Sequence, residues 1–226
     1  MIASRRRADK IRGMWGIDGL TLTGTTLDRY YHVCAFFDSR DEEYAVLAPF
    51  YREGIESGEK AVHIVDPALR RDHKRRLREA GIDVEHCESC GQLDVLSWED
   101  AYVSGGTFDP EQMLAMIDDA LTAGLRAGFP RVRAVGNMAW ACTGRPASEK
   151  LIEYETRVNE VLARTRQPAV CVYDTANLSG TLLLDILRAH PLTLVNGVVH
   201  DNPFFTSPEQ MLAEVRARSA WKQTAY

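Results

Sequence analysis

The sequence lacks several patterns that place a chain in a common class. No apolar stretch approaches the ~20 residues that a membrane-spanning helix needs. The arginines that follow Met1 are not followed by an apolar segment, so no secretory signal peptide is predicted. The five cysteines, an odd number, fit reduced thiols better than a disulfide framework. We therefore expect a cytoplasmic protein that does not bind a membrane.

An excess of basic charge is also missing. The 226 residues carry a formal net charge of -5, whereas a general nucleic-acid-binding protein needs a basic face. One basic run stands near the start, at Arg5, Arg6, Arg7, Lys10 and Arg12. Such a run can touch DNA or an anionic membrane, but we interpret it as a solvated tail. No direct nucleic-acid partner is expected.

The motifs of nucleotide and hydrolase chemistry are absent too. Neither G-x-x-x-x-G-K-[ST] nor G-x-G-x-x-G follows the first strongly apolar run, and the acidic residues Asp41, Glu42 and Glu43 stand where phosphate would bind. There is no G-x-S-x-G turn. The thiols of Cys34, Cys142 and Cys171 lie in or just after apolar strands, where cysteine is usually inert. These absences predict a protein that is not an enzyme.

What the sequence does contain is an alternation of strands and helices. Hydrophobic residues make up 45% of the chain and charged residues 26%, which are ordinary globular values. Strands are predicted over 30–37, 60–66, 82–87, 92–98, 131–140 and 168–174, and helices over 38–59, 67–81, 109–128, 148–165, 178–190 and 207–220. Asn196-Gly197 between apolar pairs predicts a closing hairpin. We predict one α/β domain over 28–226, with a mostly parallel sheet, an antiparallel edge and an N-terminal arm over 1–27.

Ligands of open α/β sheets bind beyond the carboxyl ends of the strands. The stretch VRAVGNMAW brings an amide, a thioether and an indole to such an end. Aromatic and thioether groups with few polar ones are typical of a small-molecule pocket, although the same residues also pack under loops. A histidine in the first strand is a weaker candidate. The predicted ligand-binding residues are His32, Phe37, Asn137, Met138, Trp140, Tyr173 and Asp174. No catalytic residue is predicted, and Glu153 and Glu155, two apart on a helix, face different ways.

A metal or redox site has one weak signal. Cys87-x-x-Cys90, with His86 beside it, offers soft ligands, and Cys34, His63 or His73 could complete a zinc site. Structural zinc normally shows a second pair at recognisable spacing, and this sequence has none. We therefore predict no metal and no cofactor, and keep Cys87, Cys90 and His86 as weak candidates.

Several motifs in order resemble the MEDS family, the sensory domain of methanogen and methylotroph regulators. They are HVCAFFDSRDEE, FYREGIESGEKAVHIVD, GTFDPEQM, VRAVGNMAW, YETRVNEV, AVCVYD, ILRAHPLTLVNG and NPFF, from about Tyr31 to Phe205. The resemblance implies a RecA-like or KaiC-like three-layer fold without a phosphate loop, and a role in sensing small hydrocarbon-derived molecules. The lead-in is too short for a helix-turn-helix. Asn137 stands where the family often has an acidic residue, which removes a possible base.

The leading hypothesis is a non-catalytic sensory domain that binds a small, largely apolar molecule. It would pass the signal to a regulatory partner such as a kinase, an anti-sigma factor or a transcription factor, with a homodimer as one arrangement. The Gly105-Gly106 loop or the 144–148 segment is the expected mobile element. Three alternatives stay open: a degenerate RecA-like nucleotide-binding ATPase, a thiol or zinc sensor working through Cys87 and Cys90, and a purely protein-binding module.

Overall fold

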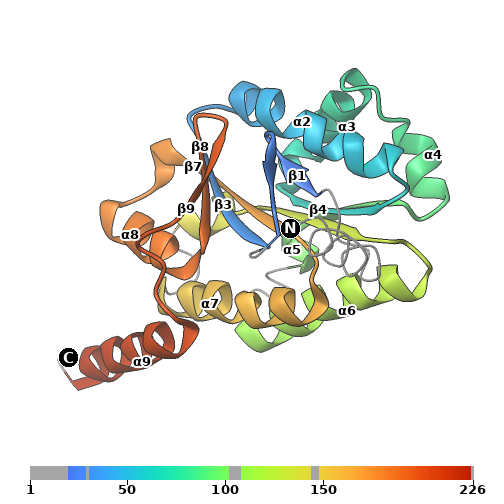
Figure 1. Cartoon of the computed structure of the whole chain (residues 1–226). Helices are drawn as coiled ribbons and strands as arrows, with labels where there is room; N and C mark the ends of the chain where they lie inside the picture. The colour runs from blue at the N-terminus through green and yellow to red at the C-terminus, as the bar shows by residue number, and fades with distance from the viewer. Residues whose placement is uncertain (1–19, 29–30, 102–107, 144–147, 225–226) are drawn as a thin grey trace, which may run out of the picture.

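The computed structural model describes residues 20–28, 31–101, 108–143 and 148–224 (Figure 1). The strands are β1 Thr21–Leu22, β2 Thr25–Thr26, β3 His32–Phe37, β4 Lys60–Val65, β5 Leu93–Ser97, β6 Val132–Asn137, β7 Ala169–Asp174, β8 Leu192–Val195 and β9 Val198–Asp201. The α-helices are α2 Arg40–Glu56, α3 Arg70–Glu79, α4 Val84–Ser89, α5 Trp98–Ala101, α6 Pro110–Arg126, α7 Ser148–Thr165, α8 Gly180–Ala189 and α9 Pro208–Thr224. Short 3-10 turns cover Pro67–Leu69, Ala139–Thr143 and Thr175–Asn177.

Seven strands form the main sheet, in the order β5-β4-β6-β7-β3-β8-β9. All neighbouring pairs are parallel except β8 and β9, which pair antiparallel at one edge. Asn196 and Gly197 join these two strands with φ angles of 49° and 74°, the left-handed values that a tight hairpin turn requires. The predicted parallel sheet with an antiparallel edge is confirmed.

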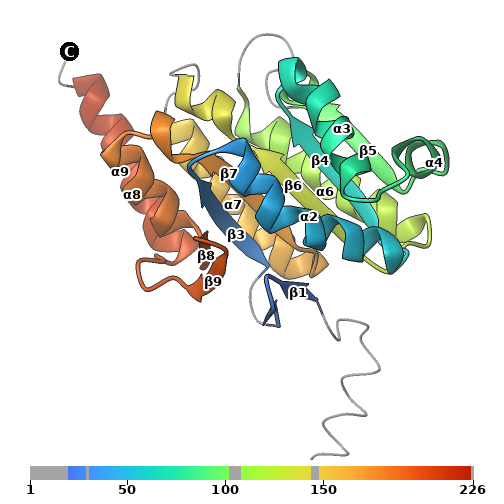
Figure 2. The same cartoon turned by 90° about the horizontal axis from the view of Figure 1, so that it is seen from above.

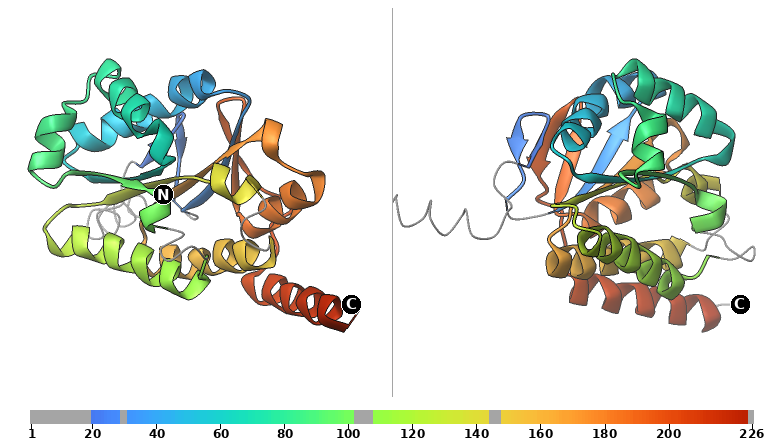
Figure 3. Two further views of the ribbon diagram at one scale, coloured as in Figure 1. Left: turned by 180° about the vertical axis from the view of Figure 1, so that it is seen from behind. Right: turned by 90° about the vertical axis from the view of Figure 1, so that its right-hand side faces the viewer.

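Helices cover both faces of this sheet and make three layers (Figures 2 and 3). Side chains alternate along each strand, so β3 sends Val33 and Phe37 to the side of α2, α3 and α4, and Cys34 and Phe36 to the side of α6, α7, α8 and α9. Two separate apolar cores result, one on each face. The three-layer α/β prediction is therefore confirmed.

The predicted N-terminal arm is described from residue 20 onward. There β1 and β2 form a small antiparallel hairpin beside α2. The side chains of Leu20, Leu22 and Leu27 are buried in the core on the α2 side. This part of the arm therefore stabilises the domain body. Residues 1–19, the Gly105-Gly106 loop and residues 144–147 lie outside the described residues.

One predicted element has the wrong type. The strand predicted over 82–87 is the short helix α4, because the carboxylate of Asp83 accepts a hydrogen bond of 3.0 Å from the backbone N–H of His86 and so begins a helix. The other predicted strands and helices are present. Within the described ranges, the helices are too short or too polar to cross a membrane.

Candidate functional site

A cavity of about 100 Å³ lies beyond the carboxyl ends of β3, β6 and β7, beside the start of α2. We call it the carboxyl-edge cavity. Four predicted ligand-binding residues, Phe37, Asn137, Tyr173 and Asp174, line it. Its other lining residues are Ser39, Arg40, Glu43, Leu69, Ala139 and Val172. The sheet topology thus brings together residues that lie far apart in the sequence.

The polar atoms of this cavity are mostly engaged by the chain itself. Asn137 Oδ1 accepts a hydrogen bond of 3.1 Å from the backbone N–H of Ala139, which leaves its NH₂ group as the donor it offers. The carboxylate of Asp174 accepts hydrogen bonds from Ala176 and Asn177. The hydroxyl of Tyr173 belongs to the opposite face of the sheet. On this strand side of the cavity, the NH₂ group of Asn137 is thus the polar group left to bind a ligand.

The start of α2, where a nucleotide fold would hold phosphate, is closed by its own side chains. Ser39 Oγ accepts from the backbone N–H of Glu42 at 3.2 Å, and the Glu42 carboxylate accepts from the backbone N–H of Asp38 at 2.8 Å. Ser39 is the N-cap of the helix, and the Glu42 carboxylate reaches back one residue beyond it, to the backbone N–H of Asp38. The Glu42 carboxylate thus occupies a backbone N–H group that a phosphate would need, and its negative charge repels anions from the helix start.

Charged and polar side chains lie on the α2 side of the carboxyl-edge cavity. Burial raises the pKa of Glu43 to about 7, against the opposing charges of Arg40 and Arg76. Behind it, His63 Nδ1 lies 2.9 Å from His73 Nε2. Burial lowers the pKa of His63 to about 4, so this ring is neutral at neutral pH. This wall suits a polar ligand better than an apolar one.

Two predicted pocket residues do not reach the carboxyl-edge cavity. Met138 and Trp140 are 0% and 2% exposed and belong to the core on the α6 and α7 face. The Trp140 ring packs against the Phe108 ring with centroids 5.0 Å apart. The chain turns after β6 into a 3-10 segment over Ala139–Thr143, and both side chains fold back over the sheet instead of facing the cavity. They stabilise the core.

A second and larger cavity, of about 230 Å³, lies at the amino end of β3. We call it the amino-end cavity. It is lined by the start of β3, one side of α7 and the segment that leads into α9, with residues Tyr31, His32, Asn159, Glu160, Leu162, Ala163, Pro191, Phe205 and Pro208. Most of its lining surface is apolar. Of the predicted ligand-binding residues, it contains His32.

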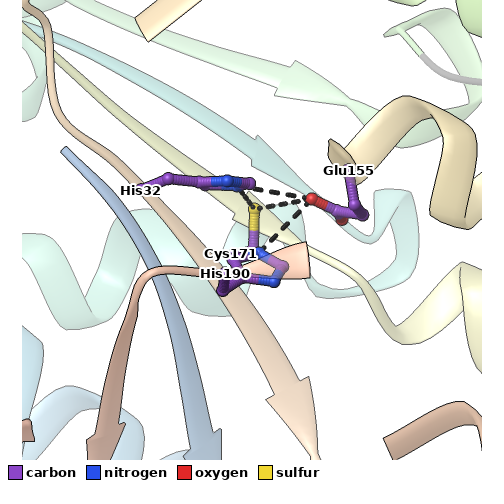
Figure 4. A group of neighbouring side chains, drawn as sticks. All are labelled: His32, Glu155, Cys171 and His190. Carbon is purple, nitrogen blue, oxygen red and sulfur yellow. Dashed lines mark hydrogen bonds and ion pairs between the residues drawn. The ribbon is translucent and has the colours of Figure 1, made fainter. Parts of the chain in front are cut away.

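His32 also belongs to a buried cluster with Glu155, Cys171 and His190, whose side chains point toward one another (Figure 4). His32 comes from β3, Glu155 from α7, Cys171 from β7, and His190 from the residue after α8. All four are at most 7% exposed, and one ligand atom of each lies within 4.8 Å of those of the others. We call this set the His-Glu-Cys cluster.

Glu155 Oε2 is the centre of the His-Glu-Cys cluster. It lies 3.4 Å from Nε2 of His32, 3.4 Å from Nε2 of His190 and 3.6 Å from Sγ of Cys171. Its other oxygen, Oε1, accepts a hydrogen bond of 2.7 Å from the hydroxyl of Tyr173. Burial, followed by the nearby charge of His190, lowers the pKa of His32 to about 4. The ring of His32 is therefore neutral at neutral pH.

The tautomers of both histidines follow from their outer partners. Nδ1 of His190 lies 2.8 Å from the carbonyl oxygen of Ile186, which can only accept. Nδ1 of His32 lies 3.2 Å from Oδ1 of Asn159, whose NH₂ group already donates to the carbonyl of Ala189. Each Nδ1 therefore carries a proton, and each Nε2 faces Glu155.

The weak metal candidates Cys87, Cys90 and His86 lie together in and just after α4. Cys87 is buried in α4 and Cys90 is exposed just after it, and among the described residues neither belongs to a group of three or more side chains that could hold a metal ion. Sequence reasoning missed Glu155, Cys171 and His190. One signal was present for Glu155. It lies four residues after Leu151 and three before Val158, on the apolar stripe of α7, so it had to be buried.

Two sequence comparisons relate the chain to known proteins. The family model described as "MEthanogen/methylotroph, DcmR Sensory domain" (MEDS) matches residues 31–191. The transcriptional repressor DcmR of Methylorubrum extorquens is 24% identical over 171 residues, which cover 75% of this chain and 61% of the repressor. The chain therefore spans about three fifths of the length of the curated relative that it matches.

Two solved structures from Pyrococcus horikoshii share the fold. A KaiC-like protein superimposes with a TM-score of 0.52 and 17% identity, over 72% of this chain and 69% of its own. An uncharacterized protein in complex with an unknown peptide superimposes with a TM-score of 0.59 and 11% identity, over 78% of this chain and 83% of its own. The predicted KaiC-like architecture is confirmed. At these identities the likeness concerns the fold alone.

Proposed function

The chain belongs to the MEDS family of sensory domains, and on that premise we propose that it binds a small, largely apolar molecule without catalysing a reaction on it. The domain has a sensory and regulatory role, as its family match and its repressor relative indicate. The proposal adds the chemical class of the ligand and the place where it binds. We assign the ligand to the amino-end cavity.

The size and lining of the amino-end cavity carry this assignment. It has about 230 Å³, against about 100 Å³ at the carboxyl edge, and its surface is mostly apolar. A dry apolar cavity of about 150 Å³ is enough to hold benzene in a folded protein. The carboxyl-edge cavity has Arg40, Glu43 and Asp174 in its wall, and an apolar molecule there would desolvate charges. The amino-end cavity is the better fit.

The polar groups of the amino-end cavity are few, and they are suited to orientation rather than to chemistry. His32 and Asn159 are hydrogen-bonded to each other, and the second ring nitrogen of His32 faces Glu155 and Cys171. The imidazole therefore presents mainly its carbon edge to a ligand. Glu160 lies at the rim and is exposed. No positioned nucleophile with an adjacent base is found among the described lining residues, which supports binding without catalysis.

A route for the signal follows from the same lining. Phe205 and Pro208 stand in the wall of the amino-end cavity and lead directly into α9, which packs on α7. A ligand changes an equilibrium only if it binds two conformations with different affinity. Contacts to Phe205 and Pro208 would make binding depend on the placement of α9. The relative is a transcriptional repressor, so we infer that a regulatory partner protein reads this change.

Two cavity-filling variants test the assignment. Ala163→Phe places a ring in the amino-end cavity, and Ala139→Phe, its matched control, places the same ring in the carboxyl-edge cavity. Melting temperature is measured with a panel of alkanes, alcohols and ketones of one to six carbons. We expect at least one compound to raise the melting temperature of the wild type and of Ala139→Phe, but not of Ala163→Phe. Loss of the effect in Ala139→Phe alone would place the ligand at the carboxyl edge and contradict the assignment.

A further inference from the structure

We propose that His32, Glu155, Cys171 and His190 bind one divalent transition-metal ion, zinc being the ion that this set of ligands suits best. Two imidazoles, a thiolate and a carboxylate are a standard set of zinc ligands in proteins. The four side chains come from β3, α7, β7 and the residue after α8, so the ion would join the sheet to two helices of one face. This inference does not depend on the ligand of the amino-end cavity.

The distances between the ligand atoms match the edges of a zinc tetrahedron. Zinc bonds of about 2.0–2.3 Å to nitrogen, oxygen and sulfur give edges of roughly 3.3–3.6 Å. The three contacts of Glu155 Oε2 with the other ligand atoms are 3.4, 3.4 and 3.6 Å, and Nε2 of His32 lies 3.4 Å from Sγ of Cys171. The remaining separations are within 4.8 Å. Small rotations of side chains close the tetrahedron around one ion.

The outer hydrogen bonds prepare both rings for a metal. The carbonyl of Ile186 and Oδ1 of Asn159 hold the protons on the Nδ1 atoms, so both Nε2 lone pairs point inward. Metal-ligating histidines are commonly held by such a partner. Tyr173 donates to Oε1 of Glu155 and leaves Oε2 for the ion. Nε2 of His190 has no hydrogen-bond partner although it is fully buried.

A cation explains this arrangement better than a buried ion pair does. A protonated imidazole that donated to Glu155 would lie at about 2.7–2.9 Å from the carboxylate, whereas both rings lie at 3.4 Å. With neutral rings, the Cys171 thiol can donate its proton to Oε2 of Glu155. The lone pair of Nε2 of His190 still faces this carboxylate without a proton between them, which is unfavourable in a buried site. One divalent ion with a thiolate and a carboxylate brings the net charge of the site to zero.

Elemental analysis of the full chain, purified without chelator and then loaded with zinc or cobalt, tests the proposal. We expect about one metal ion per chain. The cobalt form should show a thiolate-to-cobalt charge-transfer band, because one ligand is Cys171. The variants Cys171→Ser and His190→Gln should lower the metal affinity at least tenfold, and Cys171→Ser should lose the band. The spectrum of the wild type is informative even if a variant folds poorly.

Two thiol variants serve as matched controls. Cys34 pairs with Cys171 across adjacent strands, but its thiol donates to the carbonyl of Leu192. Cys87 lies in α4 on the opposite face. Cys34→Ala and Cys87→Ser should both retain the ion and the band. The proposal is overturned if the wild type binds no ion after loading, if the cobalt form lacks the band, or if Cys87→Ser loses the ion while Cys171→Ser keeps it.

Discussion

His32 donates its Nδ1 proton to Oδ1 of Asn159 over 3.2 Å, and these residues lie 127 positions apart in the chain. The bond joins the first strand of the main sheet to the middle of α7. It sets the tautomer of a ring that lines the amino-end cavity and also points into the His-Glu-Cys cluster. The proposed ligand site and the proposed metal site therefore share one side chain.

Asn159→Leu should weaken metal binding without removing a ligand. The variant loses the acceptor that holds the His32 ring, and loss of such an outer partner typically costs 10–100-fold in metal affinity. Competition with a chromophoric chelator measures the effect. Asn159→Asp, which keeps an oxygen acceptor at the same place, should lose less. Equal affinities of wild type and Asn159→Leu would show that the bond does not orient the ring.

Glu43→Gln should stabilise the protein more at pH 8 than at pH 5. The pKa of Glu43 is raised from 4.5 to about 7 in the folded protein. Between these values the unfolded chain ionises first, so ionisation favours unfolding, and the native protein loses stability as the pH rises through that window. Each pKa unit corresponds to about 1.4 kcal/mol, which gives an upper bound of about 3 kcal/mol.

Urea unfolding at several pH values measures this difference. Glu56→Gln, at an exposed position of the same helix, is the control and should follow the wild type at every pH. A stability difference between Glu43→Gln and wild type that stays constant from pH 5 to pH 8 would be inconsistent with a raised pKa at Glu43.

Glu59→Ala should destabilise the domain by roughly 3–5 kcal/mol, as removal of one partner from a buried ion pair does. The Glu59 carboxylate lies between the buried guanidinium groups of Arg131 and Arg133, at 2.6 and 2.5 Å. Glu56→Ala, which breaks only an exposed contact of 3.8 Å with Arg52, should change stability by less than about 0.5 kcal/mol. Similar losses in both variants, measured by urea unfolding, would contradict a special role for Glu59.

ATP with magnesium should produce no binding heat in calorimetry at millimolar concentration. The start of α2 carries three carboxylates, and Glu42 already occupies the backbone N–H of Asp38. Replacing Glu42 with Ala should not create binding, because no lysine is supplied for the phosphates. A dissociation constant below about 1 mM for the wild type, where binding free energy passes about 4 kcal/mol, would revive the degenerate ATPase alternative.

Most of the fold was predictable because local signals and burial agreed. The apolar run that ends at Phe37 predicted a buried strand, and β3 is one. Asp109 as a helix cap, followed by Pro110 at the first helical position, predicted the start of a helix, and α6 begins there. The strand predicted over 82–87 was wrong because an apolar and polar alternation this short also fits one helical turn. The cap at Asp83 decided between them.

The sites were less predictable, because they depend on how distant segments meet. Strand order placed Asn137 beside Phe37 and Asp174, as expected for a parallel sheet. The amino-end cavity could not be predicted without knowing where α9 packs, and no local sequence pattern shows this. To predict the His-Glu-Cys cluster, one must know which residues of neighbouring elements lie side by side. In the sequence, Cys171 looks like an inert thiol in an apolar strand, and only its position beside Glu155 and His190 distinguishes it.

Nuclear magnetic resonance of a protein labelled at its methyl and aromatic groups tests the central claim most directly. The chain is titrated with the compound that stabilises it most in the panel of small apolar molecules. We predict chemical shift changes that saturate and are largest at Leu162, Ala163 and Phe205 of the amino-end cavity. The matching signals of Leu69 and Ala139, at the carboxyl edge, should stay in place. Changes confined to Leu69 and Ala139, or no change with any compound up to its solubility limit, would contradict the account.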